Sequence, residues 1–123
     1  MKIIQTEKMP KAAGHYSTVI EHQGLLYISG QLPLDPITRE KPDTFREEVD
    51  LVFKKLDLLL KEAGSARNQV LQMRIFLSDI ALWPEINDLY AAFFGDHKPA
   101  RIVVPSPPLH YGCSLEIEAT AFV

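Results

Sequence analysis

Near its carboxyl end the chain reads Ser114-Leu115-Glu116-Ile117-Glu118-Ala119-Thr120-Ala121-Phe122, in which apolar and polar residues alternate. A period of two is typical of a β-strand whose two faces meet different surroundings. The pattern therefore predicts a strand over residues 114–122. It also places Glu116 and Glu118 on the same face of that strand.

Four further strands are predicted upstream of it. Residues 18–22 and 25–29 are rich in β-branched and other apolar residues, and only Gln23-Gly24 separates them. Glycine in a two-residue connection favours the positive φ that a tight hairpin needs, so these two runs are expected to pair. Apolar runs at residues 70–77 and 101–104 complete the set.

Two helices are predicted between these strands. From residue 44 to residue 63 apolar side chains recur at the spacing of one helical face: Phe45, Val49, Val52, Phe53, Leu56, Leu59, Leu60 and Ala63. Thr44 with Glu47 matches a capping box, and Gly64 can end the helix in a left-handed conformation. The second helix is expected to begin at Pro84 and to end before Gly95.

This order of elements indicates an α+β fold with a single domain over residues 1–123. Right-handed crossovers would place both helices on the same face of a mixed sheet. No remaining segment covers the other face, which carries apolar residues by alternation. We therefore expect that face to be buried against other copies of the chain, in a homo-oligomer.

Composition argues against a nucleic-acid partner. The chain has 123 residues, of which 46% are hydrophobic and 24% charged, with a net charge of −3 and a pI near 5.8. Phosphate binding needs clustered basic residues, and here they are scattered. Lys54, Lys55 and Lys61 lie among acidic residues such as Glu48, the mixture expected of a solvated helix face.

The sequence also lacks signals for targeting or metal binding. No apolar run is long enough for a signal peptide or a membrane helix, which predicts a cytoplasmic protein with no membrane partner. The four histidines and the single cysteine lack ligand spacing, so no metal is expected. Cys113 is interpreted as a small core residue, and His97 as a surface residue of a loop.

Arg101 opens the apolar run Ile102-Val103-Val104. A guanidinium is costly to bury beside β-branched residues without an anion, and its planar fork fits a carboxylate. That carboxylate could belong to Glu116 or Glu118, in a structural ion pair, or to a ligand. The residues alone leave both interpretations open.

Five motifs then occur in order along the chain: Gly14-His15-Tyr16-Ser17, Tyr27-Ile28-Ser29-Gly30-Gln31-Leu32-Pro33-Leu34-Asp35-Pro36, Asn87-Asp88-Leu89-Tyr90, Pro99-Ala100-Arg101 and Glu116-Ile117-Glu118-Ala119. Together they resemble the Rid family of reactive intermediate deaminases, also called the YjgF or endoribonuclease L-PSP family. The resemblance implies a chorismate-mutase-like fold, in which two helices pack on one face of a mixed six-stranded sheet. It also implies a homotrimer with ligand clefts between subunits.

The resemblance further implies roles for particular residues. Arg101 would hold the substrate carboxylate, and Glu116 would position a water molecule and transfer protons. The other residues expected at the substrate are Tyr16, Asn87, Val103 and Ser29-Gly30-Gln31, the last three in a turn. Structural alternatives stay open: Tyr16 as a buried aromatic, Ser29 in an internal hydrogen bond, Asn87 tying its helix to a loop, and Glu118 paired with Arg74.

Some positions depart from the family pattern. Val103 stands where deaminating members commonly have cysteine, and His15 stands where they have proline. The loop Val104-Pro105-Ser106-Pro107-Pro108 also differs from the usual sequence. These differences could alter the preferred substrate.

The leading hypothesis is a deaminase that hydrolyses enamines and imines such as 2-aminoacrylate to 2-keto acids and ammonia, with no cofactor. One alternative is a trimer that only binds or senses small 2-keto acids. A less favoured one is a ribonuclease or translation inhibitor, because the sequence offers no basic groove and no stacking platform of aromatic residues.

Overall fold

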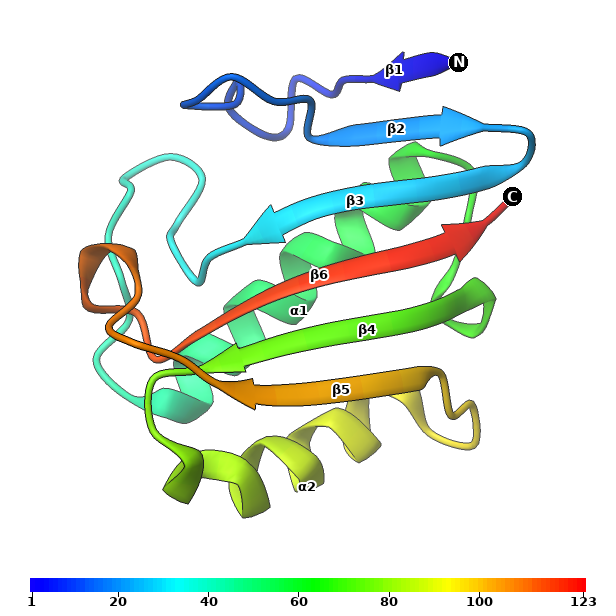
Figure 1. Cartoon of the computed structure of the whole chain (residues 1–123). Helices are drawn as coiled ribbons and strands as arrows, with labels where there is room; N and C mark the ends of the chain where they lie inside the picture. Colours follow the sequence, from blue (N-terminus) through cyan, green and yellow to red (C-terminus); the bar gives the residue numbers. More distant parts are fainter.

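A six-stranded mixed sheet with two helices on one of its faces forms the structure (Figure 1), a computed structural model that describes residues 1–123. The elements are β1 (Lys2–Ile4), β2 (Val19–His22), β3 (Leu25–Gln31), α1 (Phe45–Glu62), β4 (Val70–Leu77), α2 (Trp83–Phe94), β5 (Ala100–Pro105) and β6 (Leu115–Phe122). This architecture confirms the predicted fold class.

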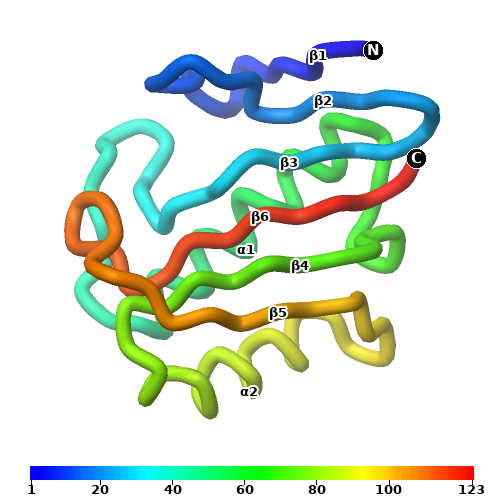
Figure 2. Tube along the Cα trace, in the orientation of Figure 1, coloured from blue at the N-terminus to red at the C-terminus, as the bar shows by residue number.

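The last strand of the chain lies in the middle of the sheet, between β3 and β4 (Figure 2). The strand order is β1-β2-β3-β6-β4-β5. Only β4 and β5 run parallel, and α2 connects them, as a parallel crossover requires. The alternating pattern of β6 thus belongs to a strand with neighbours on both sides.

The helix ends follow the predicted chemistry. The Thr44 hydroxyl oxygen accepts a hydrogen bond from the Glu47 amide at 3.2 Å and donates one to the Glu47 carboxylate at 3.1 Å. After α1, Gly64 has a φ of 80° and the Ser65 amide donates to the Leu60 carbonyl at 2.8 Å. Neither α1 nor α2 combines the length and the apolarity that crossing a membrane would need.

One predicted strand boundary is wrong, and one strand has no predicted counterpart. β3 continues to Gln31, with a register shift between Ile28 and Gln31 opposite β6. Ser29, Gly30 and Gln31 therefore end a strand at a bulge and do not form a turn. The strand β1 was not predicted, because three residues are too few to show a period.

The two faces of the sheet differ in burial, as the alternating sequence pattern of β6 predicts. Leu115, Ile117, Ala119 and Ala121 are buried under the helices in one core. Residues on the other face include Tyr27 and Ile102, which remain 48% and 50% exposed in a single chain. In the same face Arg74 donates to Glu118 at 2.9 Å, which confirms the pairing considered for Glu118.

Two charged residues of α1 contradict the interpretation of a solvated face. Glu48 is only 2% exposed and accepts a hydrogen bond from the Ser114 amide at 2.8 Å. Lys55 is half-buried, and its ammonium donates to the carbonyls of Leu32 at 2.8 Å and Leu34 at 3.1 Å. Both side chains satisfy backbone groups of segments that pack against the helix.

Cys113 and His97 are both at least partly buried in the fold. Cys113 is buried, and that burial raises the pKa of its thiol to about 11. His97 is partly buried, contrary to the surface location expected of it, and its Nε2 lies 2.7 Å from the Val70 carbonyl oxygen. No group of three or more histidine, cysteine, aspartate or glutamate side chains is arranged to hold a metal ion.

Candidate functional site

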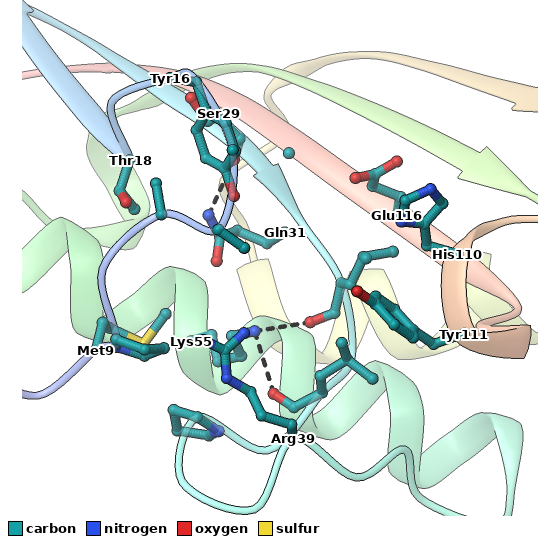
Figure 3. A pocket seen from close by; sticks show the side chains of 18 of the residues that line it. Met9, Tyr16, Thr18, Ser29, Gln31, Arg39, Lys55, His110, Tyr111 and Glu116 are labelled. Atoms are coloured by element: carbon teal, nitrogen blue, oxygen red, sulfur yellow. Dashed lines mark hydrogen bonds between the residues drawn. The ribbon is translucent and has the colours of Figure 1, made fainter.

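A pocket of about 620 Å³ lies where β3 and β6 meet the loops around them (Figure 3). It contains five of the predicted site residues: Tyr16, Ser29, Gly30, Gln31 and Glu116. Residues of the loop after β3 and of α1 also line it, so the pocket reaches from the open face of the sheet round the end of β3 to the helical layer. Arg101, Asn87 and Val103 do not line it.

Glu116 lies against the backbone of β3. A Cβ atom added at Gly30 would come within 2.8 Å of Glu116 Oε2, so only glycine leaves room for the carboxylate in this position. Burial raises the pKa of the Glu116 carboxyl, an effect that nearby His110 opposes and Glu118 reinforces. A carboxyl group with a raised pKa is suited to general acid–base chemistry near neutral pH.

The raised pKa of Glu116 has a consequence for stability. The fold favours the protonated carboxyl, so its contribution is present at low pH and is lost as the pH rises through the folded-state pKa. We expect Glu116→Gln, which mimics the protonated form, to melt at a higher temperature than wild type near pH 7 and at a similar temperature near pH 4. Thermal unfolding at the two pH values measures this. A wild-type advantage at neutral pH would contradict it.

Two polar side chains near Glu116, those of Ser29 and Gln31, already form hydrogen bonds within the chain. The Ser29 hydroxyl donates to the Ser17 carbonyl at 2.6 Å, and the buried Gln31 amide donates to the Ser29 carbonyl at 3.1 Å. Ser29 is left with acceptor capacity only. Tyr16 is 53% exposed, so the alternative of a buried aromatic is wrong for the single chain.

Arg101 belongs to a second cluster, formed with α2. Its Nη1 donates to Asn87 Oδ1 at 3.1 Å, and its guanidinium carbon lies 4.8 Å from the ring centroid of Tyr90 and 5.7 Å from that of Trp83. Asn87 thus holds the arginine and does not tie α2 to a loop. No carboxylate lies within 4.0 Å of Arg101, so the structural ion pair with Glu116 or Glu118 is absent.

The two clusters lie on opposite faces of the sheet. Arg101 is paired with Met73 and Val103 with Ile75, and these β4 residues point into the core under the helices. Glu116 is paired with Phe76, on the face without helices. Because paired residues of adjacent strands share a face, Arg101 and Glu116 point away from each other within one chain.

Several pocket residues were not predicted, namely Arg39, Lys55, His110 and Tyr111. Tyr111 is 71% exposed and has a φ of 59°, a left-handed conformation that is unusual for a bulky residue. Its neighbour Gly112, also at positive φ, was the available signal for a tight connection before β6. Arg39 and Lys55 gave no such signal, because their location depends on how the loop after β3 folds back.

The sheet thus carries a half-buried carboxylate, Glu116, on one face and an arginine without an acidic partner, Arg101, on the other. The family model described as Endoribonuclease L-PSP matches residues 6–123. The chain belongs to this family, the Rid/YjgF family, as its motifs predicted.

Known members are similar over nearly the whole chain. A RutC family protein from Aquifex aeolicus is 37% identical over 123 residues, which covers 98% of each chain. The crystal structure of RidA from an Antarctic Psychrobacter species has a TM-score of 0.94 and 32% identity, with 100% of each chain covered. Escherichia coli TdcF, solved with bound serine, has a TM-score of 0.93 and 30% identity, covering 100% of this chain and 99% of that one.

Proposed function

We propose that this chain is a deaminase that hydrolyses small 2-imino acids, and the enamines that tautomerise to them, to 2-keto acids and ammonia. The observation that carries the proposal is Arg101, a partly buried guanidinium held by Asn87 over the Tyr90 ring with no anionic partner in its own chain. Such an arginine is suited to bind the carboxylate of a ligand through both of its nitrogen donors.

The proposed site is formed between subunits of a homotrimer, with Arg101 from one subunit and Glu116 from the next. This arrangement accounts for the opposite directions of the two side chains and for the exposed apolar residues of the open face. Light scattering should give the mass of three chains. A stable monomer that retains full activity would contradict the arrangement.

In the proposed reaction the carboxylate of the substrate binds Arg101, which orients the adjacent C=N group. Ionised Glu116 accepts a proton from a water molecule as the water oxygen bonds to C2, and the imine nitrogen takes up a proton. The proton held by Glu116 then moves to the amino nitrogen of the carbinolamine, and the C–N bond breaks to release ammonia as the hydroxyl proton passes to solvent, which gives the 2-keto acid and restores ionised Glu116. One water is consumed and no electrons are transferred, so no redox cofactor is required.

The test is an assay coupled to a pyridoxal-phosphate enzyme that releases 2-aminoacrylate. The purified protein should accelerate the formation of pyruvate and ammonia above the spontaneous rate. Absence of acceleration at all protein concentrations would exclude the deaminase.

A second candidate function is the binding of small 2-keto or amino acids without turnover. The serine bound to TdcF favours it, since serine carries an α-carboxylate that an arginine can hold. Calorimetric binding of 2-oxobutanoate without any acceleration of imine hydrolysis would identify this function. Nuclease activity is not proposed, because the chain has a net charge of −3 and its basic residues are scattered along the sequence.

Gly30 gives a test of the Glu116 position that leaves the rest of the site intact. We expect Gly30→Ala to lower the deaminase rate by roughly tenfold or more, because the new methyl group displaces the carboxylate from its place against β3. The melting temperature should barely change, since the atom displaced is the end of a flexible side chain.

The matched control combines Gly30→Ala with Glu116→Gln. If the glycine acts only through the carboxylate, adding Gly30→Ala to Glu116→Gln should lower the residual rate no further. A full additional loss would show that Gly30 acts on the substrate directly.

A further inference from the structure

Three cationic side chains line the pocket, Lys11, Arg39 and Lys55, and the last two lie on the side away from Glu116. Lys55 comes from α1 and Arg39 from the loop after β3, and Figure 3 shows them well separated from Glu116 and His110. Neither cation has a carboxylate within 4.0 Å. We call these two side chains the cationic wall.

Of the cationic wall, Lys55 is half-buried and held by backbone carbonyls, whereas Arg39 is exposed. The Lys55 ammonium uses two of its donors on the carbonyls of Leu32 and Leu34, at 2.8 and 3.1 Å, which leaves one donor for another partner. Burial and, next, repulsion from Arg39 lower the pKa of Lys55. Two like charges in a partly dry pocket destabilise each other unless an anion lies between them.

Asp35 does not cancel this charge, since its attraction is the smallest of the influences on the pKa of Lys55. Asp35 also lines the pocket, but its Oδ1 accepts hydrogen bonds from the amides of Ile37 at 2.8 Å and Thr38 at 2.9 Å. It therefore shapes the loop that carries Arg39. The charge of the cationic wall remains available to a ligand.

The pocket is also larger than the smallest substrates need. In the single chain its volume of about 620 Å³ is roughly twenty times the 30 Å³ or so that one water takes in the liquid. A substrate such as 2-aminoacrylate would fill only the part beside Glu116. The remaining part leads to Lys55 and Arg39.

We propose that the cationic wall binds a second anionic group of the substrate, so that the site prefers 2-imino dicarboxylic acids to 2-imino acids with alkyl side chains. This inference rests on the proposed deaminase and specifies its substrate class. The α-carboxylate would contact Arg101 and the distal carboxylate would contact Arg39 and Lys55, with C2 near Glu116 between them.

The test compares two product analogues by calorimetry, in phosphate-free buffer: 2-oxoglutarate, with a distal carboxylate, and 2-oxobutanoate, with an alkyl side chain. Wild-type protein should bind 2-oxoglutarate about tenfold more tightly, the scale of one additional charge-assisted contact in a partly buried site. Imines generated in place by amino-acid oxidases, from glutamate and from alanine, should show the same order of hydrolysis rates.

Arg39→Gly is the decisive variant. Arg39 has a φ of 65°, which glycine adopts without strain, so this variant should fold at least as well as wild type. It should lose most of the preference for 2-oxoglutarate and bind 2-oxobutanoate as before. Arg46→Gln, which removes an exposed guanidinium at the start of α1 outside the pocket, should leave both affinities unchanged.

Equal affinities in wild type, or a preference that survives both Arg39→Gly and Lys55→Gln, would overturn the proposal. If the protein hydrolysed the alanine-derived imine but showed no preference for dicarboxylic ligands, only the role proposed for the cationic wall would be overturned, and the deaminase would stand. Failure to hydrolyse either imine would overturn the deaminase as well. Inorganic phosphate whose binding is lost in Arg39→Gly, but which does not displace 2-oxoglutarate from wild type, would assign the wall to free phosphate and not to substrate.

Discussion

Replacement of Arg101 by alanine is expected to abolish the acceleration of pyruvate formation from 2-aminoacrylate, with a loss of at least about 100-fold, because the only group proposed to hold the substrate carboxylate is removed. The fold should survive, since Arg101 is only partly buried and the one hydrogen bond of its side chain is to Asn87. The coupled assay measures the rate, and thermal unfolding verifies the fold.

Two variants sharpen this result. Arg101→Lys keeps the charge and loses the planar fork, so it should recover only a small part of the rate. Arg46→Gln removes an equal charge from an exposed position and should retain the wild-type rate. If Arg101→Ala hydrolysed the substrate as fast as wild type, the arginine would have only a structural role beside Tyr90 and Asn87.

Mixing two inactive variants is expected to restore activity. Arg101→Ala retains Glu116, and Glu116→Gln retains Arg101. Since the two side chains point to opposite faces of one sheet, each cleft would take one from each of two neighbouring subunits. Random reassembly of equal amounts should therefore give about a quarter of the wild-type clefts, the fraction in which both neighbours contribute an intact residue.

The experiment needs subunit exchange, which differently tagged variants reveal by co-purification. The double variant Arg101→Ala/Glu116→Gln, mixed with either single variant, is the control and should remain inactive. Mixed oligomers that contain both single variants and show no activity would contradict a site shared between subunits.

Most of the fold could be predicted because the residues repeat at the period of their element. The alternation of β6 and the helical spacing of α1 each extend over several repeats, and Thr44 and Gly64 mark the helix ends. The three residues of β1 contain no repeat. The family resemblance implied a turn at Ser29-Gly30-Gln31, whereas Gly30 lies at a strand end where a carboxylate approaches the backbone.

The site was harder to predict, because its geometry depends on contacts between distant segments. The motifs identified Arg101 and Glu116, yet their opposite directions follow from the register of β5 and β6 against β4, which no local pattern encodes. Lys55 and Glu48 resemble ordinary surface charges in sequence. Their burial depends on the segments around Leu32 and Ser114 that fold over α1.

Because Arg101 and Glu116 lie on opposite faces of one sheet, the proposed activity per chain would also depend on the concentration of the protein. In the proposed arrangement a solitary chain would hold two half-sites and no complete one, so dilution below the dissociation constant of the proposed trimer should abolish the proposed activity without unfolding the chain. A cell that halved its supply of this chain near that threshold would lose more than half of its deaminase capacity. A co-expressed inactive copy would disable clefts that intact copies would otherwise complete.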